Sequence, residues 1–416
     1  MATATETITA PLPAAEQERW RPSTTGWVAR IAVQVIIFGG FLLVTAIVPQ
    51  YWADRISLAV IYAIIGLSLN VVLGYVGQVS LGHHGFVGIA AFVGAYYVTE
   101  KAGCTAEAGC AFGDFLLGMG LAVFSGGVAA MLLGLIALRI KGLYLSLITL
   151  AYGFMAERSI FEIPFLTRGG AGMPAPRPNS FLGINTASDR GFAFLTIFFL
   201  VLVLFVDWRL LRSKVGRAVL SVKHSEPVAA SYGINVVAYK LLAFILSGVF
   251  AGLAGGLMAF RATTVVSNDF NFSIALLWVL MVVVGGLGNR TGVVFISMFF
   301  ALFPFLTELW SAADHFVTET LARPMSQVTI VVGALLAILT IIQFPGGFAE
   351  QVSPITRWLR GQKFSMHPEG HGGHGAKKAA QAEGDAPKKG GGMLGKLGLH
   401  KQKSAPAENE GSEGDS

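Results

Sequence analysis

Long apolar segments recur along this chain and restrict what it can fold into. A helix needs roughly 20 apolar residues to cross the hydrocarbon core of a bilayer. Inside that core every backbone N–H and C=O group must find a partner within the protein, so separate apolar segments of this length must be helical. The sequence predicts about ten such segments, which cover residues 28–48, 56–73, 83–99, 115–138, 142–161, 191–206, 241–260, 272–287, 293–311 and 327–344.

The composition agrees with an all-α polytopic membrane protein. Charged residues make up 13% of the chain, whereas they reach about 25% in soluble domains. We predict a transmembrane domain over residues 28–350, preceded by a cytoplasmic extension over 1–27 that has no features of a cleaved signal peptide. Residues 351–416 are predicted to be a disordered cytoplasmic tail, because they contain too few large apolar residues to fold.

A polar passage over residues 207–240 sets the predicted orientation. It is rich in arginine and lysine and lies between two apolar segments. Basic loops stay on the cytoplasmic side, so we expect this passage and both termini to be cytoplasmic. Its basic run is followed by Glu226, Pro227 and several small residues, a pattern typical of two short helices that meet at a breaker. The passage is either a docking surface or a solvated loop that only sets topology.

Two cysteines, Cys104 and Cys110, fall in one predicted outer loop. An oxidising periplasm would permit a disulfide between them, and two free thiols are the alternative. Because the chain has only these two cysteines, a thiol-based metal site is excluded, and we predict no metal.

A glycine-rich stretch over residues 66–97 interrupts the apolar pattern with polar side chains. Irregular backbone at membrane depth is tolerated only where it is buried in protein or lines a watery cavity. We therefore predict a broken helix on a substrate path, with a tight cytoplasmic turn as the alternative. Residues 285–291 resemble residues 74–80, as expected of an internal repeat around a central site. The candidate pathway residues in the stretch are Asn70, Gln78, Ser80, His83 and His84.

A stripe of small and polar residues runs through the predicted segment 142–161. Gly142, Ser146, Thr149, Gly153 and Glu157 recur every three or four positions, so they share one helix face. This face either lines a pore or packs against another helix. Ser146, Thr149 and Gly153 are further candidate pathway residues.

The sequence also restricts the source of energy and the chemistry. The predicted membrane segments have almost no acidic residues away from their ends, whereas proton-coupled transporters use buried ionisable relays. Residues 390–396 approach a phosphate-binding loop, but Leu397 stands where Ser or Thr is needed. We therefore predict that the chain binds no ATP and no other cofactor. With no HExxH or GxSxG motif, we also predict no catalytic residues.

Four stretches together resemble one known family. They read GLSLNVVLGYVGQVSLGHHGFVGIAAFVGAYY (66–97), RIKGLYLSLITLAYG (139–153), GRAVLSVKHSEPVAASYGINVVAYKLLAFILSGVFAGLAGGL (216–257) and VVVGGLGNRTGVVF (282–295). In this order they look like the permeases of branched-chain amino acid ABC importers, specifically the larger of the two paired permeases. The resemblance covers roughly residues 30–350.

The resemblance implies a bacterial inner-membrane permease subunit that works with other proteins. These are a second permease, two cytoplasmic ATP-binding cassette subunits and a periplasmic substrate-binding protein, within membrane lipid and without nucleic acid. The family's coupling segment, which inserts into the cassette, maps here to residues 214–233, although Pro227 departs from its pattern. The implied cassette-coupling residues are Lys214, Gly216, Arg217, Glu226, Ala229, Ala230 and Gly233.

The resemblance thus favours import of branched-chain or related amino acids. Related permeases carry urea, short amides or aromatic acids, which remain alternative substrates. Two other classes stay open, an ion-coupled secondary transporter and a membrane receptor or scaffold that transports nothing. Vanadate-resistant, protonophore-sensitive uptake would indicate the first of these.

Overall fold

The computed structural model describes residues 39–105, 107–137, 143–168, 171–181 and 183–313, with a few single residues between 335 and 348. The predicted extension over 1–27 and tail over 351–416 lie outside these residues. Nearly all of the last predicted membrane segment, 327–344, lies outside them as well.

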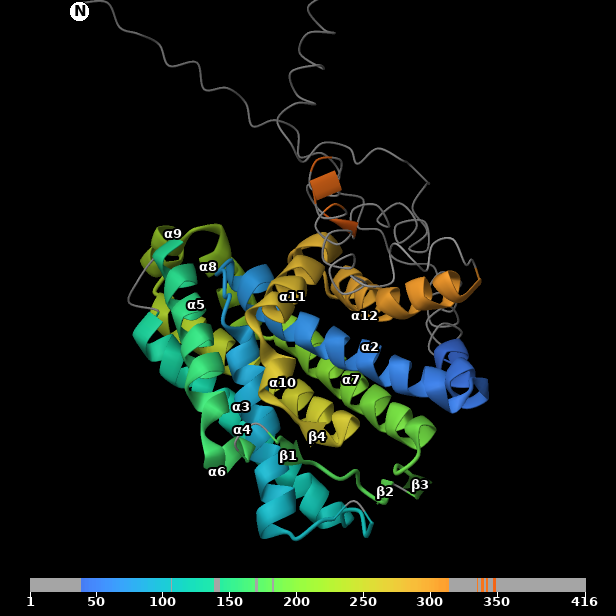
Figure 1. The fold of residues 1–416 in the computed structure, drawn as a ribbon. Helices are drawn as coiled ribbons and strands as arrows, with labels where there is room; N and C mark the ends of the chain where they lie inside the picture. The colour runs from blue at the N-terminus through green and yellow to red at the C-terminus, as the bar shows by residue number, and fades with distance from the viewer. Residues whose placement is uncertain are drawn as a thin grey trace, which may run out of the picture. The chain divides into compact units, whose positions relative to one another are not determined.

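Helices make up almost all of the described structure (Figure 1). The α-helices with complete bounds are α2 (Gln50–Leu69), α3 (His83–Tyr96), α4 (Phe112–Ala137), α5 (Leu143–Arg158), α6 (Pro164–Thr167), α7 (Asp189–Arg212), α8 (Lys214–His224), α9 (Glu226–Ser231), α10 (Val236–Ala262), α11 (Phe272–Gly285) and α12 (Arg290–Ala313). Two π-helices, η1 (Asn70–Val76) and η2 (Tyr97–Lys101), extend α2 and α3, and η3 (Ile160–Glu162) and η4 (Ser267–Phe270) are 3-10 turns. The strands are β1 (Met173–Pro174), β2 (Ser180–Phe181), β3 (Ile184–Asn185) and β4 (Thr264–Val265).

Within the described residues, 5 helices are long and apolar enough to cross a membrane. They span Gln50–Val76, Phe112–Ile136, Asp189–Arg212, Val236–Ala262 and Ser267–Gly285, and a shorter apolar helix covers Arg290–Phe305. The predicted all-α polytopic class is therefore confirmed. The number of about ten crossings stays a prediction.

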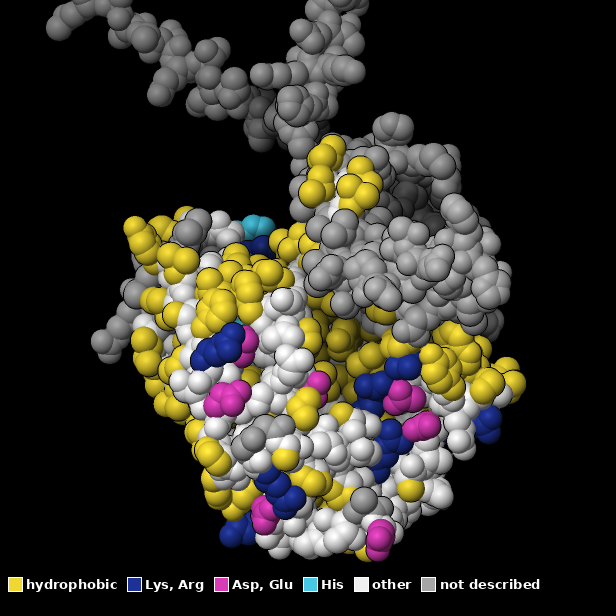
Figure 2. Space-filling model, viewed as in Figure 1, with side chains coloured by type: hydrophobic (Ala, Val, Ile, Leu, Met, Phe, Trp, Pro, Cys, Tyr) yellow, Lys and Arg dark blue, Asp and Glu magenta, His cyan; other side chains and the backbone are white. Residues whose placement is uncertain are grey.

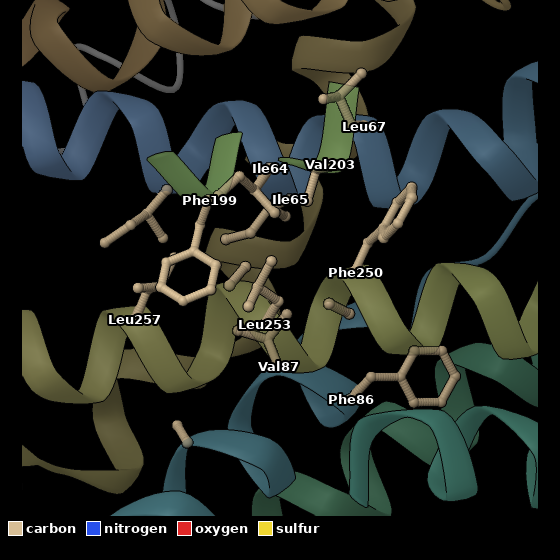
Figure 3. Packing of buried hydrophobic residues seen from close by; sticks show 14 of the residues in the cluster. Ile64, Ile65, Leu67, Phe86, Val87, Phe199, Val203, Phe250, Leu253 and Leu257 are labelled. Carbon is tan, nitrogen blue, oxygen red and sulfur yellow. The ribbon is translucent and has the colours of Figure 1, made fainter. Parts of the chain in front are cut away.

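Helix α10 lies at the centre of the bundle. It packs against α2, α3 and α4, and α2 also packs against α7 and α12. Figure 3 shows the interior where α2, α3, α7 and α10 meet, with Ile64, Ile65, Leu67, Phe86, Val87, Phe199, Val203, Phe250, Leu253 and Leu257 labelled. Lipid tails are as apolar as these side chains, so close van der Waals packing holds the helices together.

Glycines allow α4 and α10 to approach closely. Gly248 and Gly252 lie four residues apart in α10, a spacing that predicts a packing seam. A Cβ atom at Gly252 would lie 2.7 Å from the carbonyl oxygen of Ala122 and 3.0 Å from the Cα of Val123, both in α4. Because these are backbone atoms, the two helices would have to separate to admit a side chain. The geometry confirms the predicted seam.

We expect the substitution Gly252→Ala to destabilise the protein by about 1–3 kcal/mol, the usual effect of overpacking. Thermal unfolding in detergent would measure the change. Gly120→Ala is the matched control in α4, because a Cβ there would meet no atom within 4 Å. Equal unfolding temperatures for the two variants would show that the seam contributes little to stability.

Loops that the sequence predicts to lie outside the membrane pack on one another. Strands β1 and β4 pair antiparallel, with Met173 opposite Val265. The structure joins Cys104 and Cys110 in a disulfide, and the Cys110 amide donates to the carbonyl of Arg177 (3.2 Å). Residues 171–181 of the loop before α7 thus pack against other parts of the same chain.

Ion pairs connect the helix ends that lie beside these loops. Arg177 Nη1 lies 2.6 Å from Asp189 Oδ1, and Arg261 Nη2 lies 2.6 Å from Asp54 Oδ2. These contacts connect the start of α7, the end of α10 and the start of α2. Figure 2 shows such charged groups as a few small mixed clusters on a face that is otherwise hydrophobic or neutral.

Candidate functional site

The polar passage between α7 and α10 folds as two short helices, α8 and α9, as its residue pattern predicts. Ser213 separates α7 from α8, and its Oγ accepts a hydrogen bond from the Gly216 amide (3.1 Å), which caps α8. A Cβ atom at Gly216 would lie 2.7 Å from the Cα of Leu211. Only glycine fits this tight corner, so Gly216 fixes the direction in which α8 leaves α7.

The α8–α9 segment, residues 214–233, presents both apolar and charged side chains on its outer surface. Pro227 lies in the first turn of α9, where its missing N–H costs no helical hydrogen bond, so the departure from the family pattern leaves the helix intact. Tyr232 is 83% exposed and Val228 54% exposed. Gly233 follows with a φ of +78°, which favours glycine at a helix end. The remaining predicted coupling residues divide into buried Ala229 and exposed Lys214, Arg217 and Ala230.

An ion pair holds α9 against the start of α10. The Glu226 carboxylate pairs with the Lys240 ammonium, and the Lys240 side chain is only 5% exposed. A buried charge that loses its partner is strongly destabilising. Glu226 therefore has a structural role in addition to any contact with another subunit.

Helix α8 and the glycine motif at residues 285–291 both contact η1. Lys223 Nζ donates a hydrogen bond to the carbonyl oxygen of Gly74 (2.6 Å) in η1. The Gly288 amide, between α11 and α12, donates to Asn70 Oδ1 (2.9 Å). A Cβ atom at Gly74 would lie 2.6 Å from the Gly288 amide nitrogen, so the two motifs touch through their backbones. We call Asn70, Gly74, Lys223 and Gly288 the glycine junction.

A buried carboxylate lies at the same end of the bundle. Asp207 of α7 is 0% exposed, and its Oδ2 accepts a hydrogen bond from the Tyr75 hydroxyl (3.1 Å). Arg290 Nε, at the start of α12, lies 3.5 Å from the same oxygen. This triad connects α7, η1 and α12, so it supports the backbone on which the glycine junction is built.

Four buried polar residues form a hydrogen-bonded chain between α2, α3 and α10. Ser80 Oγ lies 3.0 Å from His83 Nδ1, and His83 Nε2 lies 2.7 Å from Ser247 Oγ. Ser68 Oγ in turn donates to the Ser247 carbonyl (2.8 Å). The structure thus brings two predicted pathway residues, Ser80 and His83, onto one polar chain in the bundle interior.

Other predicted pathway residues lie beside this chain, whereas Asn70 lies in the glycine junction. The Leu81 amide donates to Thr149 Oγ1 (3.0 Å), which ties the loop before α3 to α5. A Cβ atom at Gly153 would lie 2.9 Å from His84 Nε2. Thr149 and Gly153 therefore form a helix-packing seam in this conformation, while Ser146 is half-buried in the same helix. Buried polar atoms with no hydrogen-bond partner among the described residues include Gln78 Oε1 and both ring nitrogens of His84.

We expect Ser247→Ala to destabilise the protein by about 1–3 kcal/mol, because His83 Nε2 would lose its partner inside the bundle. Ser247→Thr keeps a hydroxyl and is the conservative comparison. Ser125→Ala is the matched control, since Ser125 is half-buried and its hydroxyl donates to the Ala122 carbonyl in the same helix. The unfolding temperatures of the three variants, each compared with the unmodified protein, measure the effect. An unchanged unfolding temperature for Ser247→Ala would show that the polar chain contributes little to stability.

Several of these contact residues were not predicted as site residues from the sequence. They are Ser68, Tyr75, Asp207, Lys223, Ser247 and Arg290. Asp207 carried a usable signal, because a carboxylate next to a long apolar segment needs a partner. Ser68 and Ser247 carried none, because single serines are common within membrane helices.

The chain matches a protein-family model and is similar to relatives from two bacteria. Residues 52–342 match the family model described as branched-chain amino acid transport system / permease component. The chain is 28% identical over 357 residues to the high-affinity branched-chain amino acid transport system permease protein LivM of Salmonella typhimurium, covering 77% of each chain. It is 29% identical over 346 residues to LivM of Escherichia coli, covering 75% of this chain and 74% of the relative. No solved structure matches the chain.

Proposed function

Because the chain belongs to the branched-chain amino acid transport system permease family, we propose that it is the transport subunit of an ATP-driven importer for branched-chain or related amino acids. It is a multi-pass membrane protein, and we place it in the bacterial inner membrane with both termini cytoplasmic. The two relatives are named as permease proteins of a high-affinity branched-chain amino acid transport system, which supports this substrate class.

The proposal includes several partners. A second permease subunit completes the pathway, two cytoplasmic ATP-binding cassette subunits hydrolyse ATP, and a periplasmic binding protein delivers the substrate. The chain itself is then a transport subunit and not an enzyme, and it needs no bound cofactor.

One observation carries the proposed mechanism, the hydrogen bond from Lys223 of the α8–α9 segment to the Gly74 carbonyl in η1. The segment exposes Val228 and Tyr232 to a partner on one side. On the other side, Lys223 bonds directly to the backbone of η1. A cassette that moves the segment therefore acts on the end of α2 without any intervening loop.

The polar chain is the proposed next step of the mechanism. Ser80 and His83 follow the break after η1, so a shift of η1 changes the hydrogen bond between Ser80 and His83 and the one between His83 and Ser247 of α10. Ligand-driven change of this kind needs contacts that differ between the two states. We propose that the polar chain is accessible first from one side of the membrane and then from the other as the substrate passes. Gln78 and His84 would bind the substrate through side-chain atoms that have no hydrogen-bond partner among the described residues.

Reconstitution in liposomes tests the function. The full complex, supplied with ATP and a leucine-loaded binding protein, should accumulate radiolabelled leucine in a vanadate-sensitive way. A protonophore should leave the rate unchanged. Uptake that resists vanadate and collapses with the protonophore would instead indicate a secondary transporter and overturn the proposal.

A further inference from the structure

A groove of about 420 Å³ lies between α7 and α10, next to the start of α8. Apolar side chains form nearly all of its lining, among them Phe205, Val206, Leu242, Ile245, Leu246 and Val249. Leu242 and Val249 lie seven residues apart on α10, which corresponds to about 10 Å of helix. The apolar wall therefore runs from the end of the bundle that carries the α8–α9 segment toward the middle of the membrane.

The two polar residues in the lining lie at its α8 end. They are Arg209 and Ser213. Ser213 Oγ is already used by the Gly216 amide and the Leu210 carbonyl. Arg209 is exposed, and no hydrogen bond or ion pair within the described part of the chain engages its guanidinium. The groove thus combines an apolar wall with one available positive charge at its mouth.

Neighbouring side chains mark this mouth as the level of the lipid headgroups. The guanidinium carbon of Arg212 lies 4.3 Å from the centroid of the Trp208 ring. Tryptophan and arginine gather where the hydrocarbon core meets the polar headgroups. An apolar chain in the groove would consequently place its polar end beside Arg209.

We propose that this groove binds an anionic phospholipid, with an acyl chain along α10 and the phosphate at Arg209. A guanidinium binds phosphate oxygens through two parallel hydrogen bonds. Basic pockets between helices on the cytoplasmic side of a membrane hold anionic headgroups in the same manner. Val215 of α8 is part of the lining, so the lipid also supports the junction of α7 with the α8–α9 segment.

Charge complementarity favours a lipid over a protein occupant. An amphiphile with one anionic end matches a groove with one cation at its end and apolar side chains elsewhere. A helix of another subunit would need an acidic residue at a single position and an apolar face along the rest. The second permease is thus the rival occupant, and the experiment must separate the two.

Native mass spectrometry of the full-length purified protein tests the proposal, with phosphatidylglycerol and phosphatidylcholine as the two probes. Phosphatidylglycerol should bind more tightly to the unmodified protein. Arg209→Gln should weaken that binding about fivefold, the effect of one basic residue at an anionic surface, and leave phosphatidylcholine unaffected. Lys101→Gln is the matched control, because Lys101 lies in η2 near the disulfide loop, at the other end of the bundle.

Any of three results would overturn the proposal. The first is equal binding of the two lipids together with no effect of Arg209→Gln. The second is a cross-link from Ile245→Cys to the second permease in the assembled complex, which would make the groove a subunit interface. The groove-filling variant Leu246→Trp should lower phosphatidylglycerol binding without changing any charge, and full retention of binding would also contradict the assignment.

Discussion

We expect Lys223→Met to lower substrate uptake about ten- to hundredfold while the complex still assembles and hydrolyses ATP. The substitution keeps the apolar length of the side chain and removes the ammonium that bonds to the Gly74 carbonyl (2.6 Å). A hydrogen bond to a charged group contributes about 1.5–3 kcal/mol. Its loss frees η1 from the α8–α9 segment, so ATP hydrolysis continues without moving the pathway.

Leucine transported per ATP hydrolysed, measured in proteoliposomes, is the informative quantity for this variant. Lys223→Arg retains a charged donor and should recover part of the transport. Lys101→Met removes a lysine from the opposite end of the bundle and should leave the ratio unchanged. A normal ratio for Lys223→Met would show that the contact does not transmit movement.

The second large effect is expected for Gly74→Val, which should destabilise the protein by about 3 kcal/mol or more. A Cβ atom at Gly74 would lie 2.6 Å from the Gly288 amide nitrogen and would overlap Asn70 Oδ1. The substitution therefore forces the two glycine motifs apart and breaks the hydrogen bond between Asn70 and Gly288. We expect low yields in the membrane and no measurable uptake from the protein that remains.

Gly113→Val provides the comparison, because a Cβ there would meet no atom within 4 Å. Thermal unfolding of both variants in detergent separates a packing effect from a general intolerance of valine. If Gly74→Val unfolded at the temperature of Gly113→Val and transported leucine normally, the glycine junction would have no role in either stability or transport.

Local features of the fold could be predicted from the sequence because they depend on neighbouring residues. The pattern of Glu226, Pro227 and small residues predicts the helix pair α8 and α9, and both helices form. Apolar length likewise locates the long helices. Residues 285–291 resemble residues 74–80 in sequence, yet the direct contact of the two motifs through Gly288 and Gly74 could not be foreseen.

Contacts between distant residues explain what the sequence could not predict. Lys223 lies 149 positions from Gly74, and from sequence it is one basic residue among several in a loop. Its role follows from the approach of α8 to η1, and no local pattern predicts that η1 is a π-helix. The pairing of Asp207 with Arg290 depends in the same way on how α7 and α12 both pack against α2.

Cross-linking from the α8–α9 segment tests the central claim that energy enters there. Tyr232 is 83% exposed, and both native cysteines are joined in the disulfide, so Tyr232→Cys introduces a single reactive thiol. Ile184→Cys, in β3 at the other end of the bundle and 44% exposed, is the control. With a short thiol-reactive cross-linker in the assembled complex, we predict a product between Cys-substituted position 232 and the ATP-binding subunit, and none from position 184. ATP-driven uptake at the normal rate with no such product from position 232 would contradict the account.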